Sequence, residues 1–87
     1  MADERAYYGQ FTLRGVGFCL EGSDDDTLFV SRLVSPTEVE PVCMITGKDR
    51  NQSHELVMLS DEAWPDDYRR TLIFAAVDQY RLWSVDH

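Results

Sequence analysis

Residues 65–85, PDDYRRTLIFAAVDQYRLWSV, decide the fold class of this 87-residue chain. Pro65 suits the first position of a helix, and Asp66 and Asp67 suit its first turn. One helical stripe then collects Tyr68, Leu72, Ala75, Ala76, Gln79, Tyr80 and Trp83. We therefore predict a helix over roughly Pro65–Val77, followed by a final strand at Tyr80–Val85.

A hairpin is the alternative for the same stretch, with strands at Thr71–Val77 and Tyr80–Val85. Thr71, Ile73, Phe74 and Val77 favour a strand. The connecting pair, Asp78-Gln79, is a poor two-residue turn because it contains no glycine. The helix gives an α+β fold, whereas the hairpin would give a small all-β barrel.

The rest of the chain reads as strands separated by turns. Gly15 and Gly17 indicate a bulge or bend in a long first strand. Residues 22–26, Gly-Ser-Asp-Asp-Asp, are typical of a turn. The strands that we predict are Tyr7–Leu20, Leu28–Val34, Val42–Thr46 and Glu55–Leu59. The first two and the last two should form hairpins in one antiparallel sheet of four to five strands, within a single domain (1–87) that has a loose tail at 1–6.

Two further expectations concern the middle of the chain and the core. Ser35-Pro36-Thr37-Glu38 fits either a single helical turn that begins with a capping box, or an ordinary Ser-Pro turn. Alternation along the strands and the helical stripe together predict the main core residues. These are Phe11, Leu13, Phe18, Leu20, Leu28, Val30, Val42, Met44, Leu56, Met58, Leu72 and Ala76.

The chain is strongly acidic, with 16 Asp and Glu residues against 8 Lys and Arg and a formal net charge of −8. The acids are clustered: Arg32 is the only Lys or Arg from Gly15 to Gly47, and neither residue type occurs from Asn51 to Tyr68. Such a surface repels nucleic acid and anionic membranes and attracts basic partners. Since the first residues are charged and the longest apolar run, Leu72–Val77, is far too short to span a bilayer, we expect a cytoplasmic protein.

Patterns of catalytic, cofactor-binding and metal-binding residues do not emerge. The two cysteines and two histidines lack the spacing of zinc sites. An EF-hand beginning at Asp24 would place Phe29 where glycine is needed. Cys19 and Cys43 lie in apolar runs, which favours two buried thiols over a disulfide between neighbouring strands. We expect a protein without enzymatic activity, cofactor or metal.

Protein binding is the remaining function, and the acidic segments are its candidate residues. Residues 60–67 surround Trp64 with acids, and tryptophan is a frequent anchor at interfaces. Trp64 could equally fold back as a lid on the small core. The predicted partner-binding residues are Asp61, Glu62, Trp64, Asp66 and Asp67, with Asp24, Asp25, Asp26, Glu38 and Glu40.

Glu38 and Glu40 suggest how such a protein would act. In an extended chain their side chains lie about 6.6 Å apart on one face, on the order of the spacing between successive phosphates of a nucleic acid strand. Small acidic inhibitors encoded by phages occupy the nucleic-acid clefts of nucleases, glycosylases and restriction or CRISPR effectors in this way, a likeness of class and not of family.

The leading hypothesis is therefore a DNA-mimic inhibitor of a basic, nucleic-acid-processing partner, such as a phage anti-defence or anti-CRISPR protein. The alternatives are an immunity protein or antitoxin that neutralises a basic toxin, and a small structural subunit of a larger assembly.

Overall fold

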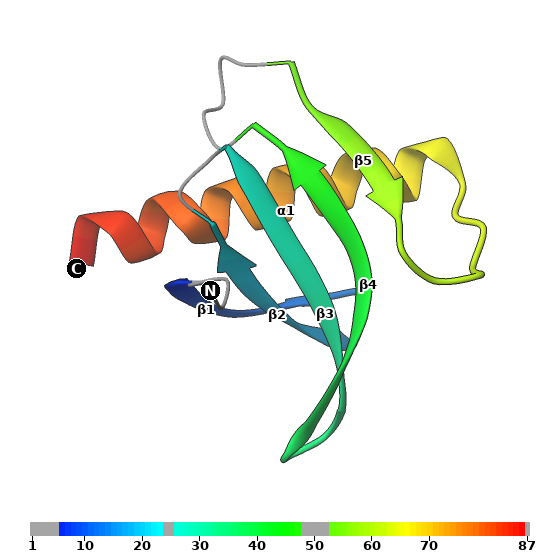
Figure 1. Cartoon of the computed structure of the whole chain (residues 1–87), viewed down its shortest axis with the longest axis horizontal. Helices are drawn as coiled ribbons and strands as arrows, with labels where there is room; N and C mark the ends of the chain where they lie inside the picture. Colours follow the sequence, from blue (N-terminus) through cyan, green and yellow to red (C-terminus); the bar gives the residue numbers. More distant parts are fainter. Residues whose placement is uncertain (1–5, 24–25, 48–52, 87) are drawn as a thin grey trace, which may run out of the picture.

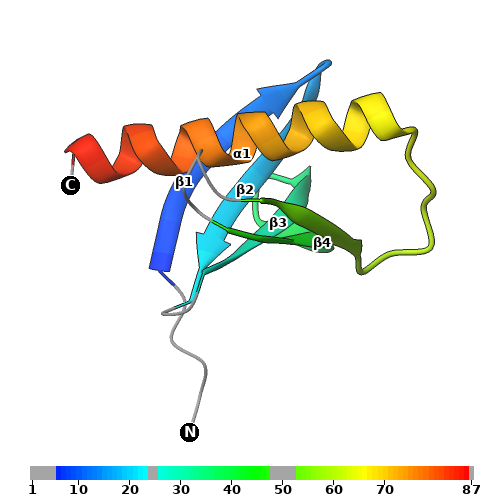
Figure 2. The same ribbon diagram turned by 90° about the horizontal axis from the view of Figure 1, so that it is seen from above.

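A five-stranded antiparallel sheet and one long helix make up the protein in a computed structural model, which describes residues 6–23, 26–47 and 53–86. The elements are β1 (Ala6–Leu13), β2 (Val16–Gly22), β3 (Thr27–Ser35), β4 (Glu38–Thr46), β5 (Glu55–Met58) and α1 (Asp66–Asp86). Each strand pairs with the next along the chain, and α1 crosses one face of the curved sheet (Figures 1 and 2). The α+β prediction is confirmed. Of the predicted loose tail, 1–5 lies outside the described residues, and Ala6 already belongs to β1.

The long first strand predicted at Tyr7–Leu20 is wrong, because the chain reverses in its middle. Arg14 and Gly15 both have positive φ, 50° and 82°, as the two central residues of a type I′ hairpin turn require. Leu13 and Val16 are partners on either side of this turn. The glycine that indicated a bend therefore makes a complete turn, and the sheet gains a strand.

The helical turn predicted at Ser35–Glu38 is also wrong, and the alternative, a Ser-Pro turn, is what forms. Pro36 and Thr37 connect Ser35 to its strand partner Glu38, and the Thr37 N–H donates a hydrogen bond to the Ser35 hydroxyl at 3.3 Å. Strand β4 consequently begins at Glu38, before the predicted Val42.

A bulge in β4 changes which side chains reach the core. Val30 pairs with Cys43 and Ser31 with Pro41, so Val42 is an extra residue between them. A bulge also accommodates Pro41, which has no N–H to give to the sheet. Beyond the bulge, Cys43 and Ile45 face α1, and the prediction of Met44 as a core residue is wrong.

Helix α1 continues through Tyr80–Val85, where a final strand had been predicted, so that prediction and the alternative hairpin are both wrong. The helical stripe holds over the whole length: Leu72 and Ala76 are buried, and Tyr80 packs edge-to-face on Tyr8 with ring centroids 4.8 Å apart. Trp83 makes a similar contact with Tyr7 at 5.6 Å. These contacts with β1 hold the last turns as helix.

The core lies between α1 and the sheet and is fully buried at Phe18, Leu20, Leu28, Val30, Cys43, Ile45, Leu72, Ala76 and Val77. The predicted Phe11, Leu13, Leu56 and Met58 are half-buried and pack against this cluster. Val42 is buried at the bulge, outside the cluster.

Both cysteines are buried and free, as the preferred interpretation held. Cys43 belongs to the core, whereas Cys19 adjoins the core residue Leu20 and so points to the other face of the sheet. Burial raises the pKa of the Cys43 thiol to about 12. The two thiols are therefore inert residues on opposite faces. Among the described residues, no helix is long and apolar enough to cross a membrane.

Phe18 should be critical to stability because its ring is 1% exposed and stacks on Phe11 at 5.4 Å. We predict that Phe18→Ala lowers the free energy of unfolding by about 3–5 kcal/mol, through lost burial and a residual cavity. Phe74→Ala is the matched control, since Phe74 is 54% exposed and should change stability little. Chemical denaturation of both variants measures the difference, and equal losses would contradict this description of the core.

Candidate functional site

The β3–β4 hairpin ends in a tip that extends beyond the helix-covered part of the sheet (Figure 1). A strand with one covered face alternates between buried and exposed side chains. Here Glu38, Val39, Glu40 and Pro41 are all exposed. Both faces of the tip are therefore accessible to a partner.

Arg32 on β3 connects this tip to the loop between β5 and α1. Its guanidinium donates hydrogen bonds to Glu40, its neighbour across the strands, at 3.0 Å, and to Glu62 at 2.8 Å. Glu62 also accepts a hydrogen bond from the Ser60 hydroxyl at 3.3 Å. This loop lies near Arg32 because the Leu59 N–H donates a hydrogen bond to the Val42 carbonyl at 2.8 Å. That hydrogen bond keeps the chain beside β4 after β5 ends.

The contact between Arg32 and Glu62 shifts the pKa values of both side chains. The hydrogen bond from Arg32 lowers the pKa of Glu62 below its ordinary value, and the hydrogen bond to Glu62 raises the pKa of Arg32. Both side chains are part-exposed, with 38% of Glu62 and 29% of Arg32 accessible. Glu62 thus stays ionised at neutral pH and is held in place.

We define the acidic hairpin end as Val34, Glu38, Val39, Glu40, Asp61 and Glu62. Arg32 pairs with two of the four carboxylates, Glu40 and Glu62, so this end carries four negative charges against one positive charge. Val34 and Val39 add apolar surface, at 58% and 50% exposure. Val39 lies between Glu38 and Glu40 on β4, so its side chain points to the opposite face of the tip from theirs.

The other predicted binding residues that the structure describes lie on other elements. Asp26 precedes the opposite end of β3, and the eight residue steps from Thr27 to Ser35 span roughly 26 Å at about 3.3 Å each. Asp24 and Asp25 lie outside the described residues. Asp66 and Asp67 occupy the first turn of α1, and Asp67 approaches Arg14 at 3.8 Å. The described members of the predicted set therefore do not form one continuous surface.

Trp64 is half-buried and packs against the core, with its ring 4.9 Å from that of Tyr68. This placement fits the interpretation of Trp64 as a lid. The exposed valines of the hairpin, which the sequence analysis missed, offer apolar contacts in its place. The signal was present in the sequence: if Pro36-Thr37 is taken as a hairpin turn, Val34 and Val39 flank a two-stranded tip.

Elsewhere, the described part of the chain contains no group of three or more His, Cys, Asp or Glu side chains that could hold a metal ion. Comparison with protein-family models, with curated proteins and with solved structures finds no match to this chain. The function is therefore argued from the residues and their arrangement alone.

The contact between Arg32 and Glu62 should make stability depend on pH. A lowered pKa in the folded state means that this ion pair stabilises the fold above the ordinary carboxyl pKa, and that the contribution is lost as the pH falls through the lowered pKa. We predict that Glu62→Gln is less stable at pH 7 by about 1 kcal/mol or less, because solvent screens a part-exposed pair. The difference from the unaltered protein should close in acid.

Asp61→Asn is the control, because it removes the same charge from an exposed neighbour that forms no ion pair with any described residue. Urea denaturation between pH 7 and about pH 3 measures all three proteins. A Glu62→Gln deficit that persists unchanged in acid would show that the charge of Glu62 does not contribute.

Proposed function

We propose that this protein is a non-enzymatic binding protein that covers a basic, nucleic-acid-binding surface of a partner protein with its acidic hairpin end. The observation that carries the proposal is the projecting tip, where carboxylates from β4 and from the β5–α1 loop gather around one arginine. A partner cleft that binds phosphates would meet fixed negative charges there in place of a nucleic acid backbone.

The geometry supports this mode of binding in two ways. Glu38 and Glu40 lie in the extended strand β4, so the spacing of about 6.6 Å that suggested mimicry applies to a formed strand. Arg32 restrains Glu40 and Glu62 before binding, so less side-chain freedom is lost when a partner docks. Exposed charges of one sign also accelerate the encounter with a basic protein.

An immunity protein or antitoxin against a basic toxin would use the same surface. Such a protein and a DNA mimic differ in what the partner normally binds. Competition by nucleic acid is therefore the informative measurement.

The experiment uses the immobilised protein to capture partners from lysate, with and without excess duplex DNA or RNA. We expect a basic protein to be retained and to be displaced by nucleic acid and by high salt. Glu38→Lys should reduce retention, whereas Glu55→Lys should not, since it makes the same charge change on an exposed residue of β5. A partner that nucleic acid does not displace would contradict the mimicry. Equal retention by the two variants would contradict the location.

A further inference from the structure

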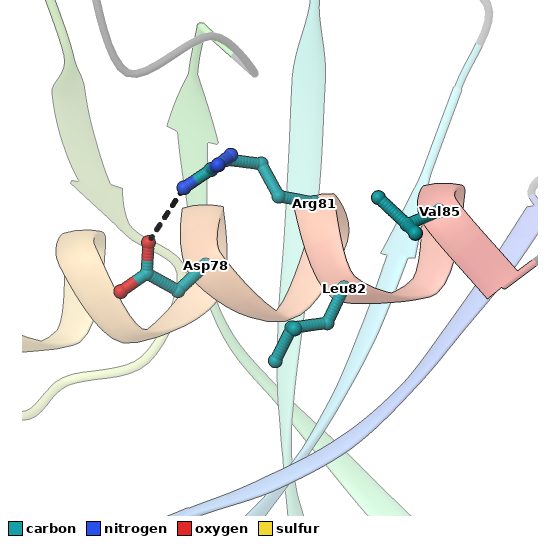
Figure 3. Close-up of a pocket in the computed structure, with 4 residues that line it drawn as sticks. All are labelled: Asp78, Arg81, Leu82 and Val85. Carbon is teal, nitrogen blue, oxygen red and sulfur yellow. Dashed lines mark ion pairs between the residues drawn. The ribbon is translucent and has the colours of Figure 1, made fainter.

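Helix α1 carries a second apolar surface, on the side away from the sheet. Phe74, Leu82 and Val85 are 54%, 64% and 85% exposed, although each is large and apolar. Figure 3 shows Leu82 and Val85 projecting from the helix beside Asp78 and Arg81, with the strands lying behind it. These four residues line a shallow hollow of about 280 Å³.

The spacing on this surface is that of a coiled-coil seam. Phe74, Asp78, Arg81 and Val85 follow one another at intervals of four, three and four residues. This is the alternation of the a and d positions of a heptad, which places all four on one line along a helix. Leu82 lies beside the seam and widens its apolar strip.

The seam is complementary to itself when two helices run antiparallel. If Asp78 of one copy faces Arg81 of a second copy, the two-fold axis passes midway between positions 79 and 80. The same axis places Phe74 opposite Val85 of the second copy, because both pairs have the same midpoint. Each apolar residue meets an apolar one and each charge meets its opposite, as an isologous interface requires.

The ion pair seen within one helix is compatible with this arrangement. Asp78 and Arg81 are 3.8 Å apart and about half-exposed, so both can turn toward a second copy. Local charge does not oppose the approach. Residues 66–86 carry three arginines against four aspartates, a net charge of −1, so most of the acidity of the chain lies elsewhere.

We propose that the protein forms an antiparallel, two-fold symmetric dimer through the α1 seam Phe74, Asp78, Arg81 and Val85, with Leu82 at its side. The seam spans eleven residue steps, about 16 Å at 1.5 Å per residue. An interface this short is smaller than those of tight complexes, so the dissociation constant should be on the order of tens to hundreds of micromolar.

Sedimentation velocity of the full chain at about 10 and about 500 µM brackets that range. The unaltered protein should shift from its monomer mass of 10.0 kDa toward twice that value as the concentration rises. Val85→Asp should weaken the association at least about tenfold, because it places a carboxylate against Phe74 of the second copy. Ser84→Asp introduces the same charge at the adjacent exposed position, outside the seam, and should have little effect.

Charge reversal tests the antiparallel register. Asp78→Arg alone brings two arginines together across the interface, and Arg81→Asp alone brings two aspartates together, so each variant should dimerise more weakly. Mixed in equal amounts, the two variants should form a heterodimer in which both charge pairs join opposite charges again. A parallel pairing predicts no loss for either variant alone, because like charges would already face each other.

Three results would overturn the proposal: a monomer at about 500 µM, equal effects of Val85→Asp and Ser84→Asp, or a mixture no more dimeric than its components. Circular dichroism of each variant confirms that the helix is retained. The acidic hairpin end is unchanged in all of these proteins, so failure here leaves the proposed binding function to its own test.

Discussion

The close approach of the last element to the first is the contact on which the rest of the structure depends. The Gln79 side-chain amide donates a hydrogen bond to the Tyr8 carbonyl at 2.9 Å, across 71 residues of sequence. Gly9 makes this possible: a Cβ there would lie 2.5 Å from Gln79 Nε2 and 3.1 Å from the Trp83 ring, and its φ of +98° suits glycine. The register of β1 shifts at this point, between Tyr7 and Gln10.

The contact between Gln79 and Tyr8 helps to determine which side of α1 faces the sheet and which side faces solvent. With Tyr80 and Trp83 packed on the aromatic residues of β1, the stripe that faces the sheet is settled along the whole helix. The seam from Phe74 to Val85 must then face outward, since a helix presents opposite sides to core and solvent. The sheet curves under one side of the helix only, and the β3–β4 tip, which α1 does not cover, remains free at its end (Figures 1 and 2).

Local patterns predicted the antiparallel sheet, the helix start at Pro65-Asp66-Asp67 and most of the core, because turn residues, alternation and the helical stripe are local signals. The end of α1 depends on contacts of Tyr80 and Trp83 with β1, more than 70 positions earlier, which no local pattern records. The error at Met44 has a similar origin. Only the pairing with β3 shows the bulge at Val42, and one extra residue reverses the face of every later side chain.

The candidate site likewise combines features that the sequence predicts with features that only the fold shows. Clustering of acids in the sequence predicted an acidic surface and included Glu38, Glu40, Asp61 and Glu62. It could not show that Arg32 joins segments 30 residues apart, or that the length of β3 separates Asp26 from them. The sequence gives the order of the charges along the chain, whereas a partner contacts the charges that the fold brings together.

The two surfaces should respond to salt in opposite directions, which follows from where the charge lies. Two copies that approach through their nearly neutral helices still repel each other through the acids of their sheets, and salt shortens the reach of that repulsion to about 8 Å at physiological ionic strength. Salt also weakens the two Asp78–Arg81 pairs across the seam, but exposed pairs of this kind contribute little. Burial of Phe74 and Val85 is not weakened by screening, so the net effect of added salt favours the seam. Binding at the acidic hairpin end draws on attraction between opposite charges, and the same screening weakens it. Salt concentration thus distinguishes a dimer formed mainly by apolar contact at α1 from a complex formed mainly by charge at the acidic hairpin end.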